Sequence, residues 1–167
     1  MAVRPIVIWP NKVLEQPAQR VTVFDAKLLE LIQDLADSMA DAEGIGIAAN
    51  QIGIGLRVAL VGQPDGSFFE IVNPEVIETS EEIEFREGCL SVPDQFELTP
   101  RFRKVKVRFQ DKTGAWHERE AEDRLAHVFQ HEIDHLNGSV FVTRLSSLKR
   151  GLIRDRMKKY KAVLKSE

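Results

Sequence analysis

The chain has 167 residues, of which 43% are hydrophobic and 29% are charged, an ordinary composition for a globular protein of one domain. No apolar run approaches the ~20 residues that a membrane-spanning helix needs. The N-terminal sequence MAVRPIVIWPNK has too short an apolar stretch for a signal peptide and is interrupted by prolines. We therefore expect a single domain over residues 1–167 that has no membrane segment and stays in the cytoplasm.

Charge is unevenly distributed along the chain. The net charge is −3, yet residues 144–167 contain nine Lys and Arg against Asp155 and Glu167, a balance of +7, so the preceding residues carry −10. A basic tail on an acidic body suggests a polyanionic partner, although a solvated helix face is the commoner meaning of such a run. The one cysteine, Cys89, rules out an intramolecular disulfide.

The first strong helical pattern covers about residues 26–42. Its apolar residues recur at helical spacing, Asp25 can serve as the N-cap, and Gly44 ends it. The segment GIGIAANQIG, residues 44–53, follows. Its small residues let the backbone pass close to another group, and it lacks the Lys-Ser/Thr of a phosphate loop. It is either a tight turn at a helix end or the wall of a cleft, into which Gln51 would donate a hydrogen bond.

Extended segments separated by turns dominate the middle of the chain. They are expected at residues 56–61, 68–72, 76–79, 105–109 and 115–121, with a break at Asn73-Pro74 and a turn at residues 111–114. Val140–Val142 is expected to be extended. Ser146 or Ser147 should begin a helix that ends at about residue 164, with an inner face of Leu148, Leu152, Met157, Tyr160 and Leu164. This order predicts an α+β domain.

The segment QHEIDHLNG, residues 130–138, carries the strongest chemical signal. On a helix His131 and His135 lie on one face, so both imidazoles can reach one metal ion, and Glu132 can act on an activated water without being a ligand. The expected helix has Asp123 as N-cap and Gly138 at C′. Its apolar stripe would consist of Leu125, Phe129, Ile133 and Leu136. A bare HExxH match can also arise by chance on an exposed helix.

Two histidines leave such a metal site incomplete. Cys89 can supply the third ligand, because a thiolate and two imidazoles leave a fourth position open for water, as catalytic metal sites do. It stands in the segment EGCLSVP, residues 87–93, between a glycine and a turn that ends in proline. From the residues alone, an inert buried cysteine is the commoner interpretation.

The segments GIGIAANQIG, EGCLSVP and QHEIDHLNG together closely resemble the three signature motifs of peptide deformylases, in the same order and at similar distances. The resemblance covers nearly the whole chain. It implies an α+β fold in which antiparallel β-sheets surround a central metal-binding helix, with an N-terminal and a C-terminal helix. It also implies a metallohydrolase that removes the N-formyl group from the formylmethionine of nascent polypeptides and releases formate.

The resemblance further implies a role for individual residues. One divalent metal ion, Fe²⁺ in this family with Zn²⁺, Ni²⁺ or Co²⁺ as substitutes, would be held by Cys89, His131 and His135. Glu132 would act as general base and then as general acid. Gln51 and the backbone N–H of Leu90 would hold the oxygen of the tetrahedral intermediate. The substrate cleft would be lined by Ile45, Gly46, Glu87, His127 and Val128.

Three positions depart from the family or vary within it. Ile47 and Asn50 stand where the first motif usually has Leu and often Pro, which predicts altered loop stability rather than lost activity. Phe96 occupies a place where the family varies, so it leaves open which residues are preferred after methionine. The basic C-terminal helix resembles that of bacterial members, in which it docks on the ribosome, and a monomer is expected.

Two rival interpretations remain open at this point. A peptidase of the HExxH kind would take its third ligand from downstream, but no histidine follows His135 and the later acidic residues are only Asp155 and Glu167. A non-catalytic, metal-stabilised ribosome-binding module would need a fourth protein ligand. His127 lies four residues before His131 and could join the same helix face.

Overall fold

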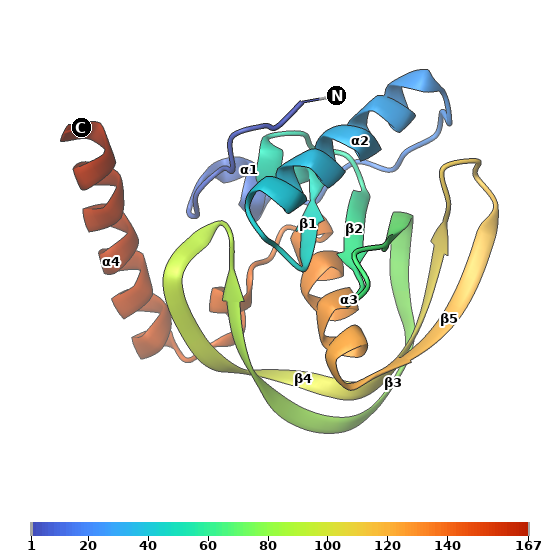
Figure 1. Ribbon diagram of the computed structural model, residues 1–167. Coiled ribbons are helices and arrows are strands. Elements are labelled where there is room, and N and C mark those ends of the chain that lie inside the picture. The colour runs from blue at the N-terminus through green and yellow to red at the C-terminus, as the bar shows by residue number, and fades with distance from the viewer. Residues whose placement is uncertain (1, 167) are drawn as a thin grey trace.

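A computed structural model describes residues 2–166 of the chain and the side chains up to residue 160 (Figure 1). The helices are α1 (Lys12–Glu15), α2 (Ala26–Asp41), α3 (Asp123–Leu136) and α4 (Ser147–Ser166), with short 3₁₀ helices η1 (Ala49–Ile52) and η2 (Phe141–Arg144). The strands are β1 (Gly46–Ala48), β2 (Val58–Gly62), β3 (Phe68–Cys89), β4 (Val92–Gln110) and β5 (Trp116–Glu122). The predicted α+β fold with a central metal-binding helix is confirmed.

All five strands form one antiparallel sheet in the order β1-β2-β3-β4-β5. Figure 1 shows that β3 and β4 curve beneath α3, which lies inside the bend. The segments expected as separate strands at residues 68–72 and 76–79 are parts of one 22-residue strand. Asn73-Pro74 does not end this strand, because the register shifts between Val72 and Glu75 and absorbs the proline as a bulge.

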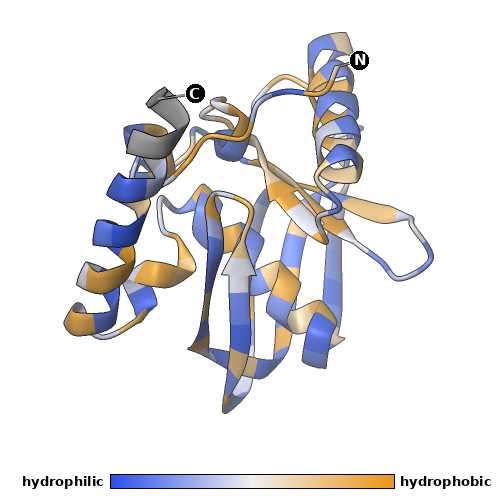
Figure 2. Cartoon of the chain, turned by 60° about the vertical axis from the view of Figure 1, so that its left-hand side comes forward, coloured by the Kyte–Doolittle hydropathy of each residue, from blue (hydrophilic) through white to orange (hydrophobic). Residues whose placement is uncertain are grey.

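The core lies on both sides of the first strands. One buried cluster joins α3 to the sheet through Phe129, Ile133 and Leu136, which confirms the apolar stripe predicted for this helix. A second cluster packs α2 against β1 and β2. Figure 2 shows hydrophobic and hydrophilic residues alternating along the long strands, the pattern of a sheet with one face packed and one solvated. The apolar face of α3 therefore packs on the sheet, and the face that carries His131 and His135 is turned away from this core.

The ends of the helices agree only in part with the sequence patterns. Asp25 caps α2 as predicted, since its Oδ1 accepts from the backbone N–H of Lys27 and Leu28. Asp123 is not the N-cap of α3: Glu122 occupies that position and makes no side-chain cap bond. Glu122 is still paired with Lys104 in the sheet, so the chain must turn sharply into the helix, and Asp123 takes a φ of 53° to do so.

The C-terminal region departs further from expectation. Residues Phe141–Arg144 form η2 instead of an extended segment. Helix α4 begins at Ser147, and Ser146 Oγ accepts from the Lys149 N–H at 3.3 Å. Its expected inner residues Leu148 and Leu152 are 72% and 47% exposed. Met157 and Tyr160 pack as predicted, and Ile153 joins them in place of the two leucines, in the cluster around Trp9 and Phe141. The side chain of Leu164 lies outside those described, and none of the helices within residues 2–166 is long and apolar enough to cross a membrane.

Gly138 lies just after the C-terminal end of α3, where a left-handed backbone and a close contact both disfavour a side chain. Its φ is +84°, and an added Cβ would lie 2.8 Å from backbone atoms of Gln16 and Pro17. We predict that Gly138→Ala lowers the free energy of unfolding by about 2–5 kcal/mol, the sum of left-handed strain and overpacking. Gly66→Ala is the matched control, since Gly66 has a φ of +88° but nothing within 4 Å of the added Cβ. Urea denaturation should show a loss of only about 1–2 kcal/mol there, and equal losses would contradict the packing argument.

Candidate metal centre

Three potential metal ligands from two elements converge at one end of a cleft. Cys89 is the last residue of β3, while His131 and His135 lie one turn apart on α3. His135 Nε2 is 3.3 Å from Cys89 Sγ and 3.1 Å from His131 Nε2. Within the described part of the chain, these residues form the one group of three or more ligating side chains with the spacing of a metal site.

The spacing of these atoms fits a single divalent ion. Metal–sulfur bonds of about 2.3 Å and metal–nitrogen bonds of about 2.1 Å at tetrahedral angles place ligand atoms about 3.3–3.7 Å apart. All the donor atoms lie within 4.8 Å of one another. Three ligands leave a fourth direction free, as catalytic sites require. A closed structural site needs four protein ligands, and among the described residues this group has three. The geometry therefore argues against a structural site.

A tight β-hairpin places Cys89. Strand β3 ends at Cys89 and β4 begins at Val92, so only Leu90 and Ser91 turn the chain. The Ser91 N–H and Gln51 Nε2 both donate to Cys89 Sγ, at 3.4 and 3.5 Å. Gln51 is itself fixed, because its Oε1 accepts from the Ala48 N–H at 2.9 Å and its Nε2 also reaches Ser91 Oγ at 3.2 Å. The glycine-rich segment, residues 44–53, thus forms β1 and η1, and it contacts the metal ligand Cys89 through Gln51.

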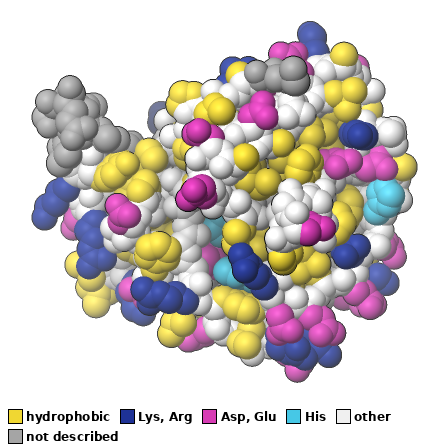
Figure 3. All heavy atoms as spheres, viewed as in Figure 1, with side chains coloured by type: hydrophobic (Ala, Val, Ile, Leu, Met, Phe, Trp, Pro, Cys, Tyr) yellow, Lys and Arg dark blue, Asp and Glu magenta, His cyan; other side chains and the backbone are white. Residues whose placement is uncertain are grey.

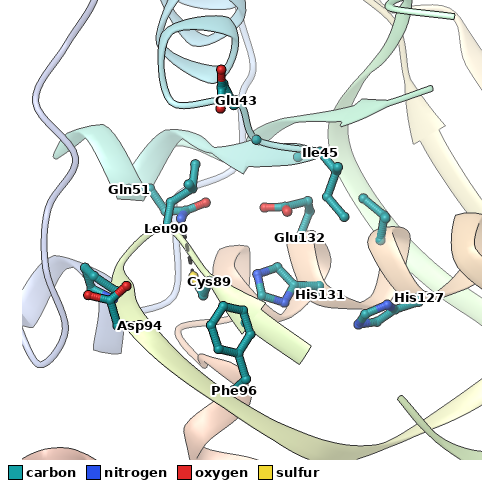
Figure 4. Close-up of a pocket in the computed structure, with 15 residues that line it drawn as sticks. Glu43, Ile45, Gln51, Cys89, Leu90, Asp94, Phe96, His127, His131 and Glu132 are labelled. Atoms are coloured by element: carbon teal, nitrogen blue, oxygen red, sulfur yellow. Dashed lines mark hydrogen bonds between the residues drawn. The ribbon is translucent and has the colours of Figure 1, made fainter. Parts of the chain in front are cut away.

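A cleft of about 410 Å³ opens beside these ligands. Figure 3 shows histidine atoms at the bottom of a hollow near the centre of this face, with hydrophobic side chains around it. Glu132, Gln51 and Leu90 line the cleft together with four of the five expected substrate residues: Ile45, Gly46, His127 and Val128. Figure 4 shows Gln51 and Leu90 on one side and Glu132 and His131 on the other. The cleft residues thus come from three distant segments, as the motifs indicated.

Glu87 is the expected cleft residue that lies elsewhere. Its carboxylate is buried behind His131, where it accepts from His131 Nδ1 and lies 2.9 Å from His127 Nε2. Arg101 donates to both oxygens of Glu87, at 3.0 and 2.5 Å, and to Asp134 Oδ2 at 2.5 Å. Glu87 therefore orients a ligand from behind and does not form the wall. Sequence reasoning missed Arg101 and Asp134, although Asp134 stands inside the HExxH motif.

Comparison with known proteins agrees with this geometry. The model of one protein family, described as polypeptide deformylase, matches residues 3–151. The chain belongs to the polypeptide deformylase family. It is 44% identical to the peptide deformylase of Desulfotalea psychrophila over 96% of this chain and 98% of that protein. It is 45% identical to the peptide deformylase of Acidobacterium capsulatum over 95% and 96%.

Solved deformylase structures share the whole fold. The structure of the Legionella pneumophila enzyme superposes with a TM-score of 0.93 at 41% identity and covers 99% of both chains. The Ehrlichia chaffeensis deformylase in complex with actinonin superposes with a TM-score of 0.92 at 34% identity, over 96% of this chain and 98% of that one. The chain is accordingly a peptide deformylase, a metallohydrolase that removes the formyl group from N-terminal formylmethionine. Family membership decides against the two rival interpretations.

Burial and neighbouring charges set the protonation of the deformylase site. Burial raises the pKa of Glu132 to about 7, and the charges of Glu87 and Asp134 act in the same direction. Oε1 of Glu132 has no hydrogen-bond partner among the described residues. Burial, with the nearby His131, holds the pKa of His135 well below its usual value, so its imidazole is neutral and able to ligate. The pKa of His131 is raised despite its burial, chiefly by Glu132, Cys89 and Glu87.

Gly46 and Asn50 explain how the first deformylase motif meets the metal helix. A Cβ on Gly46 would lie 2.5 Å from Glu132 Oε2, so the carboxylate packs directly on the glycine backbone. Asn50 is buried, and its Nδ2 donates to the His135 carbonyl oxygen at 2.5 Å. Ile47 is also fully buried, in the cluster below α2. The two departures in this motif therefore make packing and backbone contacts and do not touch the ligating atoms of Cys89, His131 and His135.

The position of Glu87 predicts an effect on metal affinity. Glu87→Gln removes the charge that holds His131 Nδ1, and loss of such an outer partner typically weakens metal binding 10–100-fold. Competition with a zinc chelator should detect this loss in folded protein, and the absorption spectrum of the Co²⁺ form should change with it. Glu84→Gln, an exposed position on the same strand, is the control. Equal affinity in Glu87→Gln and the wild type would show that Glu87 does not orient the ligand.

Proposed function

We propose that Cys89, His131 and His135 bind one divalent ion, Fe²⁺ in the cell with Zn²⁺, Ni²⁺ or Co²⁺ as substitutes, and that the site hydrolyses the formamide of formyl-Met peptides. The observation that carries this proposal is the convergence of the three donor atoms beside a buried carboxylate without a protein partner among the described residues. A thiolate and imidazole set suits these late first-row metals better than Mg²⁺ or Ca²⁺. When bound, such an ion would polarise the formyl carbonyl and activate a water molecule for attack.

Glu132 moves the proton in this proposal. With a pKa of about 7 it is substantially ionised at neutral pH, so it can accept a proton from the attacking water. It then delivers this proton to the amine nitrogen as the carbon–nitrogen bond breaks, which leaves formate and a free methionine amine. The backbone of Gly46 restricts the position of this carboxylate, because the two are in direct contact. One residue thereby serves as base and then as acid.

Gln51 and the backbone N–H of Leu90 stabilise the oxygen on which negative charge develops. Gln51 is 1% exposed and held through its Oε1, so its Nε2 is pre-oriented toward Cys89 and the cleft. A donor fixed in this way typically contributes about 3–4 kcal/mol to the transition state. Leu90 follows Cys89 in the hairpin and lines the same cleft. Preorganisation is therefore supplied by η1 and the hairpin turn.

The cleft selects the formyl group and the methionine side chain. Gly44, Gly46 and the Gly88–Cys89 backbone stand around the reacting centre and leave space for formyl, the smallest acyl group, while excluding acetyl by sterics. Ile45, His127 and Val128 provide the wall for the methionine side chain, with His127 stacked on Phe85 at 4.6 Å between ring centroids. Glu87 lies behind this wall, where it contacts His127 Nε2 at 2.9 Å and holds that imidazole in position.

We take residues 1–167 as one catalytic domain, monomeric and cytoplasmic, whose basic helix α4 docks on the ribosome. The support for docking is the charge of the segment, since residues 144–167 carry +7 on a chain of net −3. Among the side chains of α4 that the structure describes, Ile153, Met157 and Tyr160 pack on the domain, while Lys158 and Lys159 are exposed. The packed and solvated parts of the helix can thus have separate roles.

If Glu132 transfers a proton and does not bind the metal, its removal should lower turnover without lowering the metal content. Glu132→Ala should retain one metal ion per chain and lose about 10²- to 10⁴-fold in formate release from formyl-Met-Ala-Ser, because the base is removed and the ligands remain. Iron-loaded protein purified without oxygen is assayed, and metal content is measured by mass spectrometry. Glu120→Ala, an exposed position on β5, serves as control. Loss of metal together with activity would overturn the assigned role, and no turnover by the wild type would overturn the proposed function.

Docking through α4 predicts a loss that depends on salt. Reversal of Lys158, Lys159 and Lys161 to Glu should weaken ribosome binding at low salt and reduce the slope of log affinity against log salt by about one per lost phosphate contact. Peptide turnover should stay near that of the wild type. The control reverses the exposed Lys12, Lys27 and Lys112 and so makes the same change in net charge. Equal weakening in both triple variants would show that overall charge, and not α4, attracts the ribosome.

A further inference from the structure

Two large apolar side chains remain exposed on opposite sides of the cleft. Ile45 is 46% exposed and comes from the segment between α2 and β1. Phe96 is 56% exposed and comes from β4. Both line the cleft, and Figure 4 shows them on either side of the group formed by Cys89, His131 and Glu132. Exposed apolar surface at this place favours a ligand that covers it.

The Phe96 ring is held in place by its neighbours. A Cβ on Gly88 would lie 2.5 and 2.6 Å from two atoms of the ring, so the ring packs directly on the backbone of the residue before Cys89. The Arg86 guanidinium lies 5.7 Å from the ring centroid, within the range of a cation–π contact. The ring is therefore positioned before a ligand arrives, and little conformational entropy is lost when its exposed surface is covered.

The occupant follows from the chemistry already assigned to the cleft, so this inference rests on the proposed function. With the formyl group beside Cys89 and Glu132, the rest of the peptide must leave through the open side of the cleft. An extended chain advances about 3.3 Å per residue, which brings the residue after methionine to the mouth of the cleft. We propose that Phe96, with Ile45 opposite, is a specificity-determining residue that favours formyl-Met peptides with a large apolar or aromatic second residue.

The acidic residues of the rim bear on the same preference. Glu43 and Asp94 also line the cleft, and Figure 4 shows both at its edge. An acidic second residue would therefore meet two like charges against the one opposite charge of Arg86 beside the ring, while an aromatic residue carries no charge for them to repel. Covering the exposed half of a phenyl ring should raise kcat/KM by about five- to thirtyfold, chiefly through a lower KM, because the contact is the same in ground and transition states.

The test compares formyl-Met-X-Ser peptides in which X is Phe, Leu, Ala or Asp. Wild-type protein should prefer Phe and Leu over Ala, and Ala over Asp. Phe96→Ala should reduce the ratio of kcat/KM for X = Phe to that for X = Ala by about five- to thirtyfold. Phe96→Tyr keeps the ring and should keep the ratio. Leu98→Ala removes an equally exposed apolar side chain from the same strand outside the cleft, and it should leave the ratio unchanged.

The outcomes separate this inference from the function on which it rests. Turnover of formyl-Met-Ala-Ser by the wild type with a ratio that Phe96→Ala does not alter would overturn the specificity role alone. An equal loss on all four peptides would also overturn it, because a structural role has no dependence on X. A Phe96-dependent preference seen only in formyl-Met-Ala-X peptides would place the contact at the third residue and overturn the assignment to the second. No turnover of any formyl-Met peptide would overturn the proposed function as well.

Discussion

The buried carboxylate of Glu87 is the contact on which the metal centre depends. It joins the end of β3 to the metal helix through His131 and is neutralised by Arg101, which also reaches Asp134 on α3. Arg144 in turn donates to both oxygens of Asp134 from η2, at 2.6 and 2.8 Å. An unpaired charged side chain at such a buried position would cost several kcal/mol. These side chains are therefore stable as ions because carboxylates and guanidinium groups alternate along the network. Burial alone would raise the pKa of Glu87, but its partners lower it and keep it ionised.

This network of charges also explains why the carboxyl group of Glu87 is ionised, whereas that of Glu132 can gain and lose a proton near neutral pH. Glu87 has an arginine and two imidazoles as partners, whereas Glu132 has burial and two like charges nearby. The pKa values of the two carboxyl groups are thereby pushed apart, as expected where one group holds a ligand and the other transfers a proton. Because both residues are glutamates near His131, their different roles must come from their different surroundings.

The sequence predicted the elements whose signals are local. The i, i+4 histidines, the α2 cap at Asp25 and the stripe of α3 all follow from spacing, and the structure agrees. The partners of Glu87 were not predictable, because a buried arginine such as Arg101 has no local pattern that separates it from a solvated one. The exposure of Leu148 and Leu152 was missed for a related reason. Helical spacing correctly predicted Met157 and Tyr160 on the packed face. The packing around Trp9 decides that Ile153, and not Leu148 or Leu152, completes it.

The order of the strands has a consequence for how the protein folds. Every strand pairs with its neighbour in the chain, so the sheet is a meander without crossovers, and each hairpin can form from local contacts. Local pairing of this kind favours rapid folding. The metal centre, like the packing of α3 on the sheet, needs contacts between distant segments, since it joins Cys89 to His135 across 46 residues and to Gln51 across 38. The strand pairings themselves do not require the ligands to meet, so an ion bound by Cys89, His131 and His135 would stabilise contacts that the local hairpins do not supply.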